Sequence, residues 1–254
     1  MRFVVTAGPT REHLDPVRFL SNPSTGRMGF AVARAARAAG HEVTLVAGPV
    51  SLKTPPGVRR IDVVSARDML AAVLKEVKGE RRKVKDERRK VKDESPFTIH
   101  HSPFTFHLSP FTVLVMTAAV ADWRPARCSK RKLKKNEMSN MLKLVRNPDI
   151  LKTIDRLGRA RCPQRAAAPA RLIRIGFAAE TGAPAAEAAR KCREKRLDLI
   201  VGNDVTRPGS GFGTTTNRVT FVTPDGYAQH LPLMSKLAVA RRIVAFAERI
   251  ASNG

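Results

Sequence analysis

The sequence predicts an α/β protein with a Rossmann-like, mostly parallel sheet, helices on both faces, and a β-hairpin near the C-terminus. Short β-branched runs alternate with amphipathic helical patterns, which is the rhythm of βαβ units. The first run, Phe3–Ala7, ends in Gly8-Pro9, as expected for a buried strand that turns sharply at its carboxyl end. The predicted strands cover residues 2–7, 43–47, 61–64, 113–118, 172–178 and 198–201.

Capping signals place helices between these strands. Gly40 ends the first helix, Ser65 caps the second, and Ser235 lies near the start of the last. Pro148 stands at the first position of the third predicted helix, where a proline is favourable. The predicted helices cover residues 27–39, 66–77, 147–157, 184–195 and 233–251.

The C-terminal hairpin is predicted from two strand-like stretches, 217–223 and 227–231, joined by Pro224-Asp225-Gly226. The Pro-Asp-Gly sequence is typical of a tight turn. A hairpin at the edge of a sheet also offers backbone groups for pairing with a second copy.

Composition narrows the function classes. The 254 residues suit a single domain, 1–254, and the three cysteines, without CxxC spacing, suit a reducing cytosol. The net charge of +25 is typical of nucleic-acid binding, but aromatic residues are few and no such motif is present. We therefore expect no specific nucleic-acid partner. Apolar runs of membrane-spanning length are missing and Met1 leads into a core strand, so we expect a cytoplasmic protein that does not contact a membrane.

Residues 78–112 form a repeat-derived, low-complexity insertion within this domain. Its two sequence repeats share a seven-residue period, and allowed codons make them near reverse complements, which indicates an expanded DNA repeat. The repeat accounts for His100, His101 and His107 without a metal site. Because the insertion enters strand 113–118 at its amino end, we expect its deletion to leave activity largely intact.

A loop of small hydroxyl residues and glycines, 21–26, leads from the first strand into an Ala-rich helix. Backbone N–H groups at a helix N-terminus bind anions. The loop is neither GxGxxG nor a Walker loop, so the residues alone indicate a nucleotide or another phosphorylated ligand. Ligands of open α/β sheets bind beyond the carboxyl ends of the strands. Several motif residues follow such ends, and we expect them to converge: Gly8, Gly48, Asp122, Phe177 and Asn203.

Residues 6–29, TAGPTREHLDPVRFLSNPSTGRMG, resemble the opening of phosphopantothenoylcysteine synthetase, a ligase of coenzyme A synthesis. The resemblance continues in the same order over residues 43–50, 117–125, 147–151, 176–181 and 198–204. Together these blocks cover nearly the whole chain outside the insertion.

The resemblance implies a reaction and its substrates. A nucleoside triphosphate, CTP more than ATP, activates the carboxylate of 4′-phosphopantothenate with Mg²⁺, and the amine of L-cysteine then displaces CMP. It also implies a homodimer. The flavin-binding decarboxylase half of the two-domain relatives is not in this sequence, so we expect no FMN. The Mg²⁺ ligands are not indicated.

The same resemblance assigns site residues. Asn22 matches the catalytic asparagine, although an Asn-Pro turn is the alternative. The phosphate and substrate loop comprises Gly8, Ser21, Ser24, Thr25, Gly26, Gly29 and Asn203. The nucleotide-binding residues are Met116, Thr117, Ala118, Asp122, Lys132, Pro148, Asp149, Ile150, Leu151, Phe177, Lys191 and Lys195.

Each of these assignments has a plainer alternative. Asp122 could be a cap, Phe177 a core aromatic, and the basic run 130–135 that contains Lys132 a solvated loop. Lys191 and Lys195 could form a solvated helix face. Three other interpretations of the chain remain: a Rossmann oxidoreductase, which the missing GxGxxG disfavours, a basic nucleic-acid-binding protein, or an inactive copy of the ligase.

Overall fold

The computed structural model describes residues 1–254 except 79–110, 135–140, 160–170, 181–183, 205–207 and 254. Most of the predicted insertion therefore lies outside the described residues. Its flanks are Lys78, the last residue of helix α2, and Phe111, the first residue of strand β6. No helix in the described part of the chain is long and apolar enough to cross a membrane.

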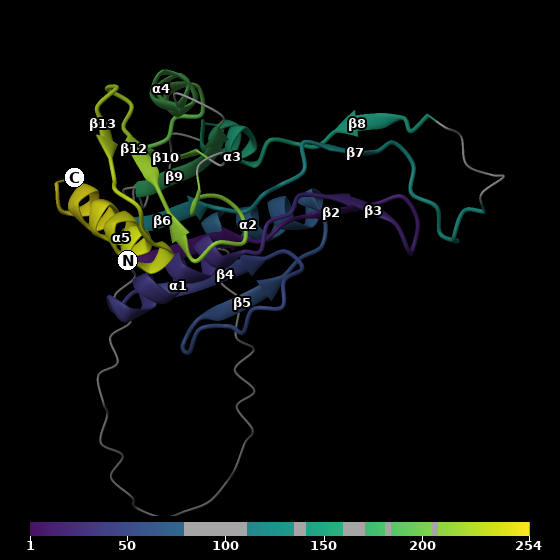
Figure 1. Cartoon of the computed structure of the whole chain (residues 1–254), viewed down its shortest axis with the longest axis horizontal. Coiled ribbons are helices and arrows are strands. Elements are labelled where there is room, and N and C mark those ends of the chain that lie inside the picture. The colour runs from purple at the N-terminus through teal and green to yellow at the C-terminus, as the bar shows by residue number, and fades with distance from the viewer. Residues whose placement is uncertain (79–110, 135–140, 160–170, 181–183, 205–207, 254) are drawn as a thin grey trace, which may run out of the picture.

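An eight-stranded sheet organises the molecule, in the order β13-β12-β10-β9-β6-β1-β4-β5 (Figure 1). The strands from β10 to β5 are parallel. In the hairpin, β12 pairs antiparallel with β10, and β13 pairs antiparallel with β12. The parallel strands follow the Rossmann order, which reverses direction between β1 and β6. The bounds are β1 Arg2–Ala7, β4 Glu42–Ala47, β5 Arg59–Asp62, β6 Phe111–Met116, β9 Arg171–Glu180, β10 Leu199–Asp204, β12 Val219–Val222 and β13 Ala228–His230.

Helices cover both faces of this sheet, so the predicted fold class is confirmed. Helices α1 and α5 pack on one face around a core that includes Phe3, Val32 and Ile243. Helices α2, α3 and α4 pack on the other, around Val4, Met69 and other buried side chains. Their bounds are α1 Arg27–Ala38, α2 Ala66–Lys78, α3 Ile150–Arg159, α4 Pro184–Glu194 and α5 Lys236–Ser252.

Local signals explain where the helices begin and end. Gly40, with φ 84°, follows α1 and donates its N–H to the Arg37 carbonyl, as predicted. Ser65 and Asp68 form a reciprocal capping box at α2. The Ser235 hydroxyl accepts from Ala238 N at α5. The predicted start of the third helix at 147 is wrong by three residues, because Asp149 caps a helix that begins at Ile150.

Three small antiparallel pairs of strands were not predicted from the sequence. Two of them, β2 (Arg11–His13) with β3 (Phe19–Ser21) and β7 (Trp123–Pro125) with β8 (Leu144–Arg146), project from the sheet as an arm (Figure 1). The third pairs β11 (Thr216–Asn217) with β14 (Met234–Ser235). The predicted bounds of two elements are therefore wrong. Asn217 belongs to β11 and not to the hairpin strand, which begins at Val219. Residues 233–235 precede the last helix, which begins at Lys236.

Candidate functional site

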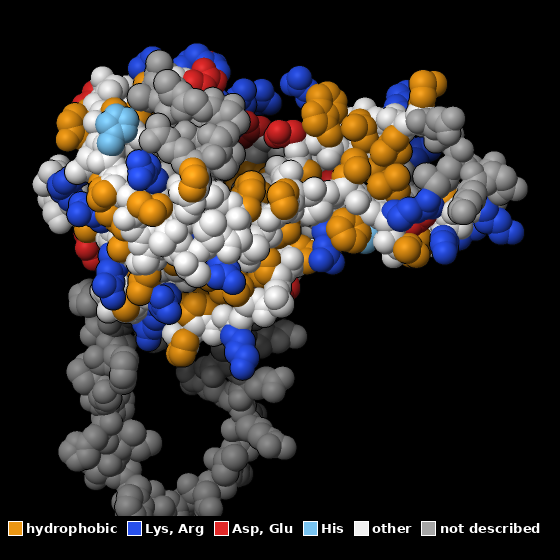
Figure 2. Space-filling view, in the orientation of Figure 1, with side chains coloured by type: hydrophobic (Ala, Val, Ile, Leu, Met, Phe, Trp, Pro, Cys, Tyr) orange, Lys and Arg blue, Asp and Glu red, His pale blue; other side chains and the backbone are white. Residues whose placement is uncertain are grey.

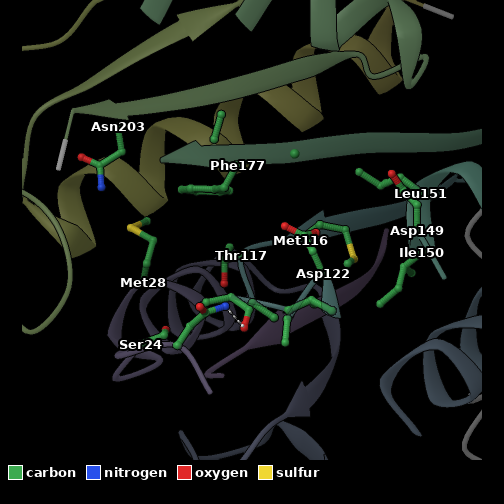
Figure 3. A pocket seen from close by; sticks show the side chains of 18 of the residues that line it. Ser24, Met28, Met116, Thr117, Asp122, Asp149, Ile150, Leu151, Phe177 and Asn203 are labelled. Carbon is green, nitrogen blue, oxygen red and sulfur yellow. Dashed lines mark hydrogen bonds between the residues drawn. The ribbon is translucent and has the colours of Figure 1, made fainter. Parts of the chain in front are cut away.

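A cavity of about 910 Å³ opens at the carboxyl ends of the parallel strands, beside the point where the strand order reverses. Its lining comes from the start of α1, the ends of β6 and β9, the start of α3, one face of α4, and the first residue of α5. One end, here the α1 end, contains Ser24, Met28 and Asn203, and the other, the α3 end, contains Asp149, Ile150 and Leu151 (Figure 3). Phe177 and Thr117 lie between the two ends (Figure 3).

Most of the residues assigned from the sequence come together around this cavity. Those in its lining are Asn22, Ser24, Thr25, Gly26, Gly29, Met116, Thr117, Ala118, Asp122, Pro148, Asp149, Ile150, Leu151, Phe177, Lys191, Lys195 and Asn203. Gly8, Ser21 and Lys132 are not part of the lining.

Gly8 and Ser21 shape the loops behind the cavity instead of facing it. Gly8 has φ 77°, and a Cβ at this position would come within 2.8 Å of Val50 Cγ1, so it makes the turn after β1. The Ser21 hydroxyl donates to the Thr10 carbonyl at 2.8 Å, which ties the Asn22 loop to the end of β1.

The N-terminus of α1 is prepared for an anion. Gly26 occupies the N-cap with φ 76°, no side chain caps the helix, and its first turn has no acidic residue. A Cβ on Gly29 would come within 2.5 Å of Ala7 Cβ and of Thr117 Oγ1. The absence of that carbon lets the first turn of α1 pack directly on β1 and on the end of β6. The unpaired N–H groups of this turn can therefore receive a phosphate or carboxylate.

Asn22 is held at the mouth of this turn. Its Nδ2 donates to the Ala119 carbonyl at 3.2 Å, and Ala119 N donates to the Gly8 carbonyl at 2.9 Å. These bonds join the loops after β1 and β6 and hold the amide beside the cavity.

At the α3 end, Asp149 fixes both a helix and a lysine. Its Oδ1 accepts from Lys152 N at 3.1 Å, and its Oδ2 pairs with Lys195 Nζ at 3.1 Å. Burial acts to raise the pKa of Asp149, but the Lys152 N–H and the charge of Lys195 outweigh it and hold that pKa below its ordinary value. Lys191 Nζ lies 3.5 Å from the Glu187 carboxylate.

Asp122 lies at the exposed rim between these two regions. Its carbonyl accepts from Asn147 N at 2.7 Å, and Asn147 Nδ2 donates to the Ala121 carbonyl at 2.8 Å. The loop after β6 is thereby joined to the segment that precedes α3.

Across the described ranges, no group of three or more His, Cys, Asp or Glu side chains forms a metal cluster. Among the described residues, Asp122 and Asp149 supply the carboxylate oxygens of the lining, the type of ligand that Mg²⁺ prefers.

Lys132 is exposed and belongs to the segment between β7 and β8. This segment is held against the turn between β2 and β3, because Leu133 N donates to Asp15 Oδ2 at 3.2 Å and Arg18 Nη2 donates to the Leu133 carbonyl at 3.0 Å. The hydrogen bond from Arg18 holds the pKa of buried Asp15 well below its ordinary value. The described part of the basic run thus contacts the loop between β2 and β3 and does not line the cavity.

The sequence reasoning missed several lining residues at or near the α1 end, among them Arg27, Met28, Gly211, Phe212, Asn217 and Lys236. Lys236 is buried, and its Nζ donates to the Gly211 carbonyl at 3.0 Å. Burial first, and then the positive charge of Arg27, lower the pKa of Lys236. The sequence carried no clear signal for it, because the predicted helix began at residue 233 and Lys236 was not its first residue.

Comparison with known proteins gives consistent matches. The family model described as "DNA/pantothenate metabolism flavoprotein C-terminal domain" matches residues 1–85 and 102–250. The chain is 42% identical over 242 residues to the coenzyme A biosynthesis bifunctional protein CoaBC of Bacillus subtilis, covering 95% of this chain and 49% of that protein. It is 38% identical to CoaBC of Escherichia coli K12 over 239 residues, covering 93% of this chain and 48% of that protein. The chain thus spans about half the length of the curated relatives it matches.

Solved structures agree with the sequence matches. The crystal structure of the C-terminal domain of CoaBC has 36% sequence identity and a TM-score of 0.69, covering 100% of this chain and 98% of that one. A DNA/pantothenate metabolism flavoprotein from Streptococcus pneumoniae, at 20% identity and a TM-score of 0.68, shares the fold. The chain therefore belongs to the family of the DNA/pantothenate metabolism flavoprotein C-terminal domain.

Proposed function

We propose that this chain is a phosphopantothenate–cysteine ligase of coenzyme A biosynthesis that uses CTP and Mg²⁺. One observation carries the proposal: a single cavity combines the uncapped N-terminus of α1, the Asn22 amide, and a wall of α3 and α4 residues with two lysines. Relatives that match over nearly the whole chain are CoaBC proteins, which supports the same reaction.

The reaction has two steps. An oxygen of the 4′-phosphopantothenate carboxylate attacks the α-phosphorus of CTP, and pyrophosphate leaves, so an acyl-cytidylate forms. The cysteine amine then attacks the acyl carbon, loses a proton, and expels CMP as the amide bond forms. Both steps build negative charge on oxygens, and fixed N–H donors and cations stabilise such charge.

The cavity supplies groups for each step. The first turn of α1, with Ser24 and Thr25, would hold phosphate oxygens, and Lys191 and Lys195 would neutralise charge near the α3 end. The Asn22 Nδ2 group would donate to the oxygen on the acyl carbon. Asp122 would hold Mg²⁺, which neutralises the charge of the triphosphate when it is bound.

Pyrophosphate release tests this function. Purified protein is incubated with Mg²⁺, 4′-phosphopantothenate and cysteine, and CTP is compared with ATP. We expect pyrophosphate with CTP only when phosphopantothenate is present, and loss of amide product in Asn22→Ala. Folded protein that releases no pyrophosphate with either nucleotide would refute the proposal and favour an inactive copy. The preparation should also lack flavin absorbance.

We further propose that the protein is a cytoplasmic homodimer that assembles through its arm. Apolar side chains gather on this arm (Figure 2), and several of those on or beside it are exposed, including Val17 at 58%, Trp123 at 45% and Leu142 at 47%. Exposed apolar patches of this kind mark association surfaces. The sheet edge at β13 is the alternative, since it leaves backbone groups unpaired.

Light scattering distinguishes these two surfaces. Leu144→Glu changes an exposed residue of the arm, and Tyr227→Glu changes an exposed residue beside β13. We expect a monomer from the arm variant and a dimer from the Tyr227 variant. The opposite result would assign the interface to β13, and monomeric wild-type protein would refute the dimer.

A further inference from the structure

Lys236 is the only Lys or Arg among the described residues whose side chain is buried. Its exposed fraction is 7%, and it lies in the cavity lining. Within the described part of the chain no carboxylate pairs with its ammonium, whose one hydrogen bond there is to the Gly211 carbonyl. A buried ammonium without a counter-ion is costly, so a protein keeps one where a ligand brings negative charge.

The position of Lys236 makes this burial more costly. Lys236 is the first residue of α5, where the helix dipole is positive. Arg27 is the first residue of α1, and its positive charge lowers the pKa of Lys236 further. Neither helix has an acidic residue in its first turn. Two helix N-termini therefore each begin with a cation beside one cavity, the reverse of the usual pattern, and an anion placed there would satisfy both.

Unpartnered polar atoms at the same place indicate a ligand independently of charge. Asn217 is 2% exposed and lines the cavity, yet among the described residues neither its Oδ1 nor the buried Oδ1 of Asn203 has a hydrogen-bond partner. Buried polar atoms are nearly always paired in native proteins. A ligand that carries hydroxyl or N–H donors close to its anionic group would pair them.

We infer that Lys236 binds a phosphate group of a substrate at the α1 end of the cavity, together with Arg27 and the N–H groups of the first turn of α1. The inference rests on the proposed function for its choice of substrates. The phosphate can belong to the nucleotide or to 4′-phosphopantothenate, since both also carry hydroxyl donors. The Gly211 carbonyl uses one of the three Lys236 N–H donors, which leaves two for phosphate oxygens.

Binding of phosphorylated and unphosphorylated ligands to wild type and variants tests this contact. The comparison separates phosphate binding from a structural role of Lys236 in holding the Gly211 loop. Lys236→Gln retains a donor for the Gly211 carbonyl but removes the charge. Arg241→Gln is the matched control, because it removes one positive charge from an exposed position of the same helix. Calorimetry compares CTP with cytidine, and 4′-phosphopantothenate with pantothenate, for wild type and both variants.

We expect Lys236→Gln to weaken binding of one phosphorylated ligand by about tenfold or more, the loss of one charge-assisted hydrogen bond. Binding of its unphosphorylated counterpart should change by less than about twofold, and Arg241→Gln should leave both unchanged within the same limit. The pair that responds identifies the source of the phosphate. Equal losses for both members of a pair would show a loop role only, and no loss in either pair would also overturn the inference.

Inorganic pyrophosphate separates this inference from the proposed function. If wild-type protein binds neither substrate, the ligase proposal fails, while weaker pyrophosphate binding by Lys236→Gln would still support the contact. If that variant does not fold, the ammonium signals of ¹⁵N-labelled wild type give the answer. Lys236→Arg identifies the Lys236 signal by removing it, and a signal that shifts with neither pyrophosphate nor 4′-phosphopantothenate would overturn the inference.

Discussion

The substitution Gly29→Ala should destabilise the protein, although alanine is normally the better helix residue. Gly29 lies in the first turn of α1, and its added Cβ would come within 2.5 Å of Ala7 Cβ and Thr117 Oγ1, and within 2.8 Å of the Thr6 carbonyl oxygen. Cβ atoms essentially never come closer than 3.0 Å to such neighbours. At least one of these neighbours is backbone of a central strand, so α1 has to move away from the sheet.

The size of the effect follows from two opposing terms. Overpacking of this kind costs about 1–3 kcal/mol, and a clash with backbone belongs near the upper limit. Replacing glycine by alanine inside a helix contributes about 0.5–1 kcal/mol in the stabilising direction. The expected net loss is about 2 kcal/mol in the free energy of unfolding, equivalent to roughly a thirtyfold change in the unfolding equilibrium.

Urea denaturation measures this loss as a lower midpoint at unchanged slope. The control is Arg34→Ala on the exposed side of the same helix, which should stay within about 0.5 kcal/mol of wild type. Because the clash also displaces the N-terminus of α1, pyrophosphate binding should weaken. A Gly29→Ala protein as stable as wild type would refute the packing argument, and unchanged pyrophosphate binding would refute the anion site at α1.

Two further predictions concern charge and chain length. Because the pKa of Asp149 is depressed, its carboxylate stabilises the fold above its unfolded pKa, and this contribution is lost as pH falls through the folded pKa. Asp149→Asn should therefore be less stable than wild type at neutral pH, and denaturation series should converge in acid; a constant difference would contradict this. Deleting residues 86–101, between the two matched segments, should change the rate of pyrophosphate release by less than about twofold, since the flanks at Lys78 and Phe111 lie away from the cavity. A folded but inactive deletion would contradict it.

The sheet and its helices could be predicted because the signals for them are local. Runs such as Phe3–Ala7 are β-branched and continuous, and caps such as Ser65 act within three residues of their own position. The arm could not be predicted, because β2 is the polar stretch Arg11–His13, with only its central residue buried, and it depends on distant partners such as Ser21. The β11–β14 pair joins two-residue strands far apart in the chain, which no periodicity can show.

The candidate site divides in the same way. Residues near the carboxyl ends of the strands, such as Ser24 and Thr117, could be placed at one edge because parallel strands share a direction. Phe177 also lines the cavity but, contrary to the prediction, it lies within β9 and does not follow the end of that strand. The start of helix α3 was predicted three residues too early, because the favourable position of Pro148 was given more weight than the side-chain cap of Asp149. Lys236 was missed because an isolated lysine near a predicted helix start suggests a solvated charge, and only tertiary packing buries it.

The charge of the chain acquires a definite meaning from this geometry. A net charge of +25 spread over a surface indicates only attraction to anions, whereas the cavity has cations at two separate ends. At the α3 end Lys195 is already paired with Asp149, so a ligand there competes with a carboxylate. At the α1 end Lys236 has no such pair among the described residues, so an anion gains its full interaction. Two anionic ligands bound from opposite ends would meet near Thr117 and Phe177, which lie between the ends, and cations on both sides would screen their like charges.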